Sequence, residues 1–193
     1  MDRVASVLPP LPPPARALLL GLVSGLRTQV PVAVLAVEAR QGRFDPGVGR
    51  LARRFASPEG ALGAVVAAAG ELVADKLAVT PDRTAPGPLF GRLVAGATVG
   101  AAVHYDAGHP RPLGAALGLA GAGIGAFGGA RLRDLLADRT GLPEPLLGAI
   151  EDLFAVALAL AVVTAGRDPG SAGGPPRPLV TGGLRPARRL LRR

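Results

Sequence analysis

The apolar positions of this chain fall into five runs, separated by polar stretches rich in arginine, proline and glycine. The runs extend over residues 16–37, 60–80, 88–105, 113–130 and 145–166. Each is about 20 residues long, and at about 1.5 Å per residue a helix of that length matches the roughly 30 Å hydrocarbon core of a bilayer. The pattern therefore predicts an all-α fold, a multi-pass transmembrane helix bundle of about five Gly- and Ala-rich spans.

The run over 60–80 is unsuited to facing lipid on all sides. Its second half carries Glu71, Asp75 and Lys76, and a charge at the centre of a bilayer costs about 2.5–3.5 kcal/mol on the insertion scale. The leucines and valines of the run return only about 2–4 kcal/mol in total. We therefore expect other helices around this one, with its charges turned inward.

The run over 16–37 contains an interruption near its centre, where Arg27, Thr28, Gln29 and Pro31 follow one another closely. Pro31 cannot donate a backbone hydrogen bond, and it disfavours helix at the residue before it. The sequence predicts a kinked or broken helix here. At membrane depth such a break is tolerated only against protein or water.

Polar segments flank and connect the runs. Residues 1–15 form a Pro-rich N-terminal segment, residues 16–166 the transmembrane helical domain, and residues 167–193 a basic tail that is expected to be disordered. The connector over 38–59 carries five arginines. Within it, Val48–Ala56 predicts either a short interfacial helix or a helix in a solvated loop. His104 and His109 flank a predicted loop and are expected to be solvated.

The composition favours a membrane protein over the alternative, an Ala-rich soluble helical domain. Hydrophobic residues make up 49% of the chain, aromatic residues only 3%, and mean hydropathy is +0.36; a soluble core of this size normally buries more large side chains. The absence of cysteine excludes disulfides and thiolate metal sites. The net charge of +8 lies mostly outside the runs. It favours anionic lipid headgroups as partners, because no nucleic-acid motif or aromatic-interleaved basic face is present.

The distribution of Lys and Arg beside the runs predicts an orientation. With five spans, the side that holds the 38–59 connector and the C-terminal tail is the more basic one. The positive-inside rule then places the tail in the cytoplasm and the N-terminus outside a bacterial inner membrane. A re-entrant segment at 16–37 would overturn this arrangement.

Small residues recur at four-residue spacing, which lets helix backbones approach closely. This pattern predicts helix packing through seven glycines: Gly21, Gly25, Gly96, Gly100, Gly121, Gly125 and Gly129.

Ionisable residues inside the apolar runs form a candidate cluster. Glu71 and Asp75 are four residues apart and share one helix face, and Lys76 is the single lysine of the chain. Arg27 is the expected partner of Glu71. The full candidate set is Arg27, Glu71, Asp75, Lys76, Arg131, Glu151 and Asp152. Intramembrane charges of this kind mark ion or proton paths, or else form a buried salt-bridge network that fixes helix register.

A weak internal echo is compatible with an inverted repeat. Residues 21–27 (GLVSGLR) parallel residues 125–131 (GAFGGAR), and each is followed by a helix that carries acidic residues. Two halves of inverted topology are common among secondary transporters.

Several of these features together resemble a known family. The markers are the G-L-R that precedes Pro31, the E-x-x-x-D-K of residues 71–76, Pro88 with Arg92, and the pair Glu151–Asp152. Over residues 16–165 the chain resembles the bacterial membrane-protein family catalogued as domain of unknown function 4126. The resemblance implies a multi-pass inner-membrane protein and brings no established activity. A looser similarity is to cation exchangers with E-x-G-D-K in two inverted repeats; this chain has one more residue between Glu71 and Asp75, no glycine there, and no lysine beside Glu151.

Two functions follow as expectations. The first is a small transporter of a cation or of protons, in which Glu71 and Asp75 bind the ion, Arg27 and Lys76 balance charge, and Glu151 completes the site. The second is a structural or assembly protein whose charges are sealed ion pairs. An enzyme is disfavoured, because no metal cluster, nucleophile–base pair or phosphate loop is visible in the sequence. No cofactor is expected, and the expected partners are the lipid bilayer, a small cation or proton, and a second copy of the chain.

Overall fold

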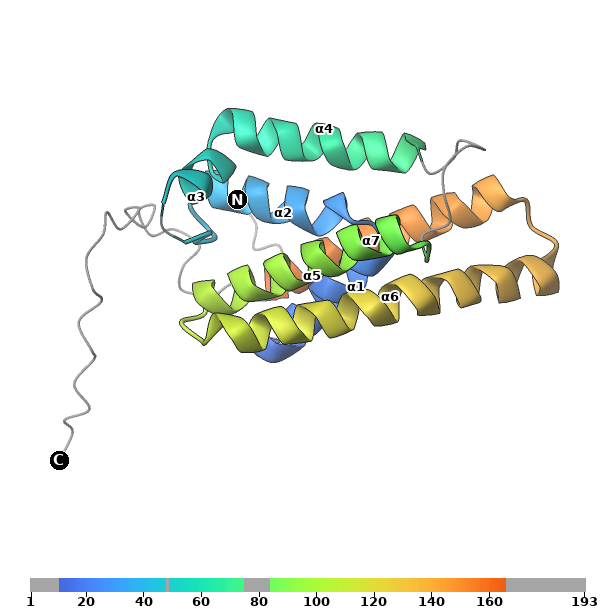
Figure 1. Ribbon diagram of the computed structural model, residues 1–193. Coiled ribbons are helices and arrows are strands. Elements are labelled where there is room, and N and C mark those ends of the chain that lie inside the picture. The colour runs from blue at the N-terminus through green and yellow to red at the C-terminus, as the bar shows by residue number, and fades with distance from the viewer. Residues whose placement is uncertain (1–10, 48, 75–83, 166–193) are drawn as a thin grey trace.

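A computed structural model describes residues 11–47, 49–74 and 84–165, which form helices and connecting loops (Figure 1). No strand occurs over these residues, so the all-α prediction is confirmed for them. The helices are α1 (Pro13–Leu26), α2 (Gln29–Arg40), α3 (Arg50–Phe55), α4 (Pro58–Ala74), α5 (Pro86–Asp106), α6 (Arg111–Thr140) and α7 (Glu144–Ala165). Residues 1–10, the whole of the expected basic tail over 167–193, and the candidate residues Asp75 and Lys76 lie outside the described residues.

The segment 16–37 folds back on itself instead of crossing the bundle. The backbone N–H of Leu11, just before α1, donates to the carbonyl of Ala165 at the end of α7 (3.4 Å). The N–H of Asp45, just after α2, donates to the carboxylate of Asp106 at the end of α5 (2.9 Å). Both ends of the α1–α2 hairpin thus lie at one end of the bundle, here called the base, which also holds α3 and the α5–α6 loop (Figure 1). One expected span is therefore a helical hairpin that returns to the end of the bundle where it began.

The break that produces this hairpin follows from Pro31. In a continuous helix the carbonyl of Arg27 would accept from residue 31, and proline has no N–H to donate. The chain leaves helical geometry at Arg27 (φ −140°, ψ 108°), and α2 begins at Gln29. Pro31 then lies in the first turn of α2, where backbone N–H groups have no intrahelical partner. The predicted break is present, a few residues before the proline itself.

Close glycine contacts show the relative directions of α1, α5 and α6, the three most closely packed helices. On α5, Gly96 lies against Ala122 and Gly118, and Gly100 lies against Gly114, so α5 and α6 are antiparallel. On α1, Gly21 lies against Gly118 and Gly25 lies against Ala122. Helices α1 and α6 therefore run parallel.

This parallel packing rules out the predicted inverted repeat. Because α1 and α6 run in the same direction, the echo of 21–27 in 125–131 does not relate two halves of opposite topology. The two motifs also differ in conformation, since α1 ends at Leu26 whereas α6 continues through Arg131 to Thr140.

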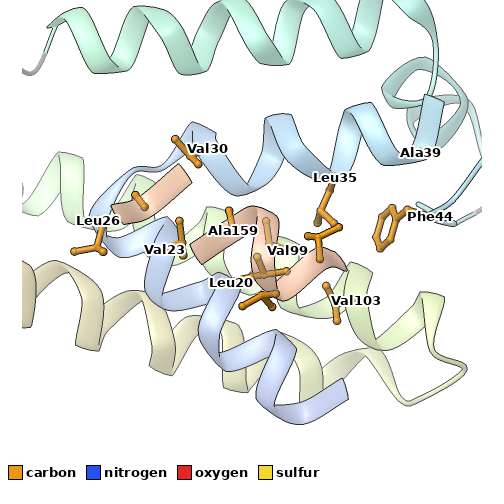
Figure 2. Packing of buried hydrophobic residues seen from close by; sticks show 13 residues of the cluster. Leu20, Val23, Leu26, Val30, Leu35, Ala39, Phe44, Val99, Val103 and Ala159 are labelled. Atoms are coloured by element: carbon orange, nitrogen blue, oxygen red, sulfur yellow. The ribbon is translucent and has the colours of Figure 1, made fainter. Parts of the chain in front are cut away.

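The interior holds small and medium apolar side chains, and much of the outside is apolar as well. Leu20, Val23, Val99 and Val103 are buried between α1 and α5, with Ala159 of α7 beside them (Figure 2). Large apolar side chains face outward on several helices, among them Phe90, Ile124, Phe127, Leu153 and Phe154. Helices α6 and α7 are each long and apolar enough to cross a membrane.

Helix α4 covers α2 on the side away from α6 (Figure 1). It is buried mainly at Ala61 and Ala68, which leaves most of its apolar surface exposed. The helix expected at Val48–Ala56 is present as the shorter α3, at the joint between the hairpin and α4.

Candidate functional site

Charged side chains from five parts of the chain converge on the tip of the α1–α2 hairpin. They are Arg27 at the tip, Glu71 of α4, Arg92 of α5, Arg133 of α6, and Glu151 with Asp152 of α7. We call these six residues the tip cluster. Arg92 lies six residues into α5 and Asp152 eight residues into α7, which places the cluster about 10 Å below the end opposite the base.

Arg27 is the most enclosed member of the cluster, with its side chain 2% exposed. Its Nε donates to Asp152 Oδ1 at 2.5 Å, its Nη1 lies 3.7 Å from Glu151 Oε1, and Nη1 also donates to the carbonyl of Leu26 (3.0 Å). A buried guanidinium needs this kind of compensation, because an unpaired charge in the interior is strongly unfavourable.

Glu71 caps the start of α2. Its two carboxylate oxygens accept the backbone N–H groups of Thr28 and Gln29, each at 2.7 Å. These are among the N–H groups that the break in the helix leaves without intrahelical partners. A carboxylate at this position also interacts favourably with the positive end of the α2 dipole.

Arg92 caps the end of α1 in the complementary way. Its Nη1 donates to the carbonyls of Gly25 (3.1 Å) and Leu26 (2.8 Å), which lie at the negative end of the α1 dipole. The same nitrogen lies 4.0 Å from Glu71 Oε1. The two charged caps thus form a pair with each other across the break.

Arg133 completes the cluster on the outer side of α7. Its Nη2 and Nε donate to Glu151 Oε2 at 2.6 and 3.1 Å. Glu151 therefore lies between Arg133 and Arg27. The six residues comprise three arginines and three carboxylates, so the cluster is formally neutral when all six are ionised.

The structure brings Arg27, Glu71, Glu151 and Asp152 together, but with pairings that differ from the expected ones. Arg27 makes its short contact with Asp152, whereas Glu71 binds the α2 backbone and faces Arg92. The expectation of an Arg27–Glu71 pair rested on similar depth alone. It is corrected because Glu71 reaches the open N–H groups of α2 directly.

Arg131, which was expected to be the second basic residue of the candidate cluster, is exposed instead. Arg133 occupies that position. At about 100° per residue, Arg133 lies about 80° around α6 from the packed Gly125, whereas Arg131 lies about 240° around it. Helical phase relative to the glycine contacts therefore distinguishes the two arginines.

Arg92 belongs to the cluster but was not among the predicted site residues. It precedes Gly96 and Gly100 at four-residue spacing, so it continues the stripe through which α5 packs on α6. An arginine on a helix-packing stripe must face protein, and this was the signal that could have identified it.

Six of the seven glycines expected at helix contacts lie at such contacts. A Cβ at Gly21, Gly25, Gly100, Gly121 or Gly125 would overlap the backbone of a neighbouring helix, and at Gly96 it would lie 2.6 Å from both Ala122 Cβ and the Gly118 carbonyl oxygen. Gly129 is half-buried. Along α6, the contacts are made by Gly114, Gly118, Gly121 and Gly125.

His104 is not a solvated loop residue, whereas His109 is exposed as expected. His104 lies near the end of α5 and is fully buried, with Nδ1 3.1 Å from the carbonyl oxygen of Pro110. Because a carbonyl only accepts, Nδ1 carries the proton, and Nε2 has no hydrogen-bond partner within the described residues. Over those same residues no group of three His, Cys, Asp or Glu is arranged to hold a metal ion.

No protein-family model, no curated protein and no solved structure matches this chain.

Proposed function

We propose that this chain is a multi-pass inner-membrane protein in which α4, α5, α6 and α7 cross the bilayer and the α1–α2 hairpin enters from the base. The inverted distribution of polarity supports this. Charged side chains such as Arg27 and Arg92 are buried, whereas Phe90 and Leu153 are 70% and 71% exposed. In water this exposure of large apolar groups would be unfavourable, and in lipid it is not.

The base is proposed to face the cytoplasm. It carries the arginines of the connector over 40–54 and Arg111, whereas exposed arginines at the opposite end alternate with Asp134 and Asp138. The positive-inside rule then places the base inside. With a re-entrant hairpin, residues 11 and 165 lie on the same, cytoplasmic side, in place of the N-terminus-outside arrangement that five spans would require.

We infer that the chain is a structural or assembly membrane protein, and that the tip cluster is a charge-balanced brace for the hairpin. One observation carries this inference: both open helix ends are held by charged side chains of other helices. Arg92 holds the α1 carbonyls and Glu71 holds the α2 N–H groups. Arg27 is in turn neutralised by Asp152. A carboxylate engaged by two backbone donors and facing a guanidinium favours a sealed interior over an open cation site.

Transport of a small cation or of protons remains the second candidate, and the discontinuous hairpin favours it. Secondary transporters commonly bind substrate where broken helices end at a polar site within the membrane. The tip cluster has this layout, and Asp75 and Lys76 follow Glu71 by four and five residues in the sequence. In this alternative, Glu71 would exchange its backbone donors for the transported ion.

Glu71→Gln distinguishes the two functions. For a brace, the variant replaces a charged cap with a neutral one, so we expect lower thermal stability in detergent and faster alkylation of a cysteine placed at Thr28. For a transporter, the variant should keep its stability and lose cation or proton flux in proteoliposomes. Flux by the wild-type protein that Glu71→Gln abolishes, without loss of stability, would reject the brace.

The matched control for this experiment is Glu59→Gln. Glu59 lies on the same helix and is exposed, so its substitution should leave the Thr28→Cys alkylation rate unchanged.

A further inference from the structure

Helix α3 presents a compact basic surface at the base of the molecule. Arg50, Arg53 and Arg54 are all exposed, and Leu51 beside them is 84% exposed. Within the described residues, no carboxylate lies at ion-pair distance from any of these three arginines. Four neighbouring exposed side chains thus combine one large apolar group with positive charge that no carboxylate of the described residues pairs with.

This surface is fixed to the bundle. Phe55 of α3 is partly buried against the hydrophobic core. At the joint with α4, the N–H of Gly60 donates to Ser57 Oγ (3.0 Å), and Gly60 packs so closely on the carbonyl of Arg54 that a Cβ there would overlap it. Figure 1 shows α3 at the end of the bundle, between the end of α2 and the start of α4. Helix α3 is therefore a firmly held element of the base.

Two other arginines of the base, Arg43 and Arg111, have partners within the described residues. Arg43 forms a bidentate pair with Glu38 (2.7 and 2.9 Å), and the guanidinium of Arg111 lies 4.0 Å from the centre of the Tyr105 ring. At the opposite end, Arg131 and Arg139 share their turns of α6 with Asp134 and Asp138. Unlike Arg43 and Arg111, the three arginines of α3 have no ion-pair or ring partner within the described residues.

We propose that α3 is a docking surface for anionic phospholipid headgroups of the leaflet at the base. The inference rests on the proposed membrane location. Guanidinium groups donate two parallel hydrogen bonds to phosphate oxygens, and Leu51 beside them suits the boundary between headgroups and acyl chains. Each arginine close to an anionic leaflet strengthens binding by about fivefold. This partner explains why the surface combines arginines with an exposed leucine instead of carboxylates.

The test measures which lipid lies beside α3. The chain has no cysteine, so Ala52→Cys places a single fluorophore on this helix. The labelled protein is reconstituted into phosphatidylcholine vesicles that contain nitroxide-labelled phosphatidylglycerol or nitroxide-labelled phosphatidylcholine, and the quenching by each lipid is compared. We expect preferential quenching by phosphatidylglycerol, several-fold at low salt. The preference should weaken in high salt because the Debye length falls from about 30 Å at 0.01 M to about 3 Å at 1 M.

The variant Arg50→Gln/Arg53→Gln/Arg54→Gln should lose the preference, and the control Arg131→Gln/Arg139→Gln should keep it. Equal quenching by the two lipids in the labelled protein that keeps all three arginines would overturn the proposal. A preference for phosphatidylglycerol that survives the triple substitution would overturn it as well. If the triple variant does not fold, the salt dependence decides: a preference that salt leaves unchanged overturns the proposal. A protein that does not float with vesicles at all would overturn the membrane location itself, which separates the two failures.

Discussion

The pair formed by Arg27 and Asp152 offers the sharpest test of the brace. Arg27→Gln removes the guanidinium that neutralises Asp152, Asp152→Asn removes the nearest carboxylate of Arg27, and the double variant removes both charges. The two side chains are 2% and 13% exposed, and their contact is 2.5 Å. They meet the conditions under which breaking one partner of a buried ion pair costs about 3–5 kcal/mol and removing both is close to neutral.

The two single substitutions should differ in size. After Asp152→Asn, Arg27 keeps the carbonyl of Leu26 and lies 3.7 Å from Glu151, so we expect a cost of about 1–3 kcal/mol. After Arg27→Gln, Asp152 loses the guanidinium at 2.5 Å while Glu151 keeps Arg133, and the full cost of about 3–5 kcal/mol applies. For a chain of this length, the larger value corresponds to a fall in Tm of about 10 °C.

The assay is thermal unfolding of the purified protein in detergent, carried out as a double-mutant cycle. The exposed Arg131→Gln serves as the control and should change stability by less than about 0.5 kcal/mol. We expect the double variant to be more stable than Arg27→Gln alone. If the two single effects simply add in the double variant, or if Arg27→Gln unfolds at the wild-type temperature, the pair does not support the hairpin and the brace is refuted.

Two further predictions concern packing and topology. Gly125→Leu should sharply reduce the folded yield in detergent, because a side chain there would overlap Leu22 and Gly25 of α1. The control Gly128→Leu, on the open side of the same helix, should be tolerated. Equal yields of the two variants would mean that α1 and α6 do not pack as described. Single cysteines at Pro12 and Gln41, both exposed, should react with a membrane-impermeant maleimide from the same side of the membrane. Labelling from opposite sides would show that 16–37 crosses the bilayer.

The sequence predicted the helices well because their signals are local. All five apolar runs contain helix, and the interruption at Pro31 depends on one missing donor and its steric effect. The path of the chain after the break was not predictable in the same way. Hydropathy over 16–37 is the same for a kinked span and for a hairpin that returns to its starting side. The choice depends on contacts with Gly118, Ala122 and Ala126 of α6, about a hundred residues away.

The residues of the tip cluster were predicted only in part, again because some of their signals are local and others depend on contacts between distant helices. A charge inside an apolar run must face protein, which identified Glu71, Glu151 and Asp152 without any tertiary information. Which arginine pairs with which carboxylate depends on how each helix is rotated about its axis and on how far it is shifted along its neighbours. Arg133 could be recognised only after the glycine contacts on α6 defined which face of that helix is inside, whereas the four-residue spacing of Arg92 from Gly96 and Gly100 is visible in the sequence.

The composition of the tip cluster can be understood as a consequence of breaking a helix inside a low-dielectric bundle. The break exposes carbonyls at the end of α1 and N–H groups at the start of α2, and no water is needed where side chains reach them. Arg92 supplies donors to the former and Glu71 supplies acceptors to the latter. Each charged cap then requires a counter-charge, and Arg92 and Glu71 meet this need partly by facing each other. Arg27, displaced from helical geometry by the same break, is compensated by α7. Within the described residues, the charges that hold the two open helix ends and Arg27 are thus each matched by a charge of opposite sign from another part of the chain.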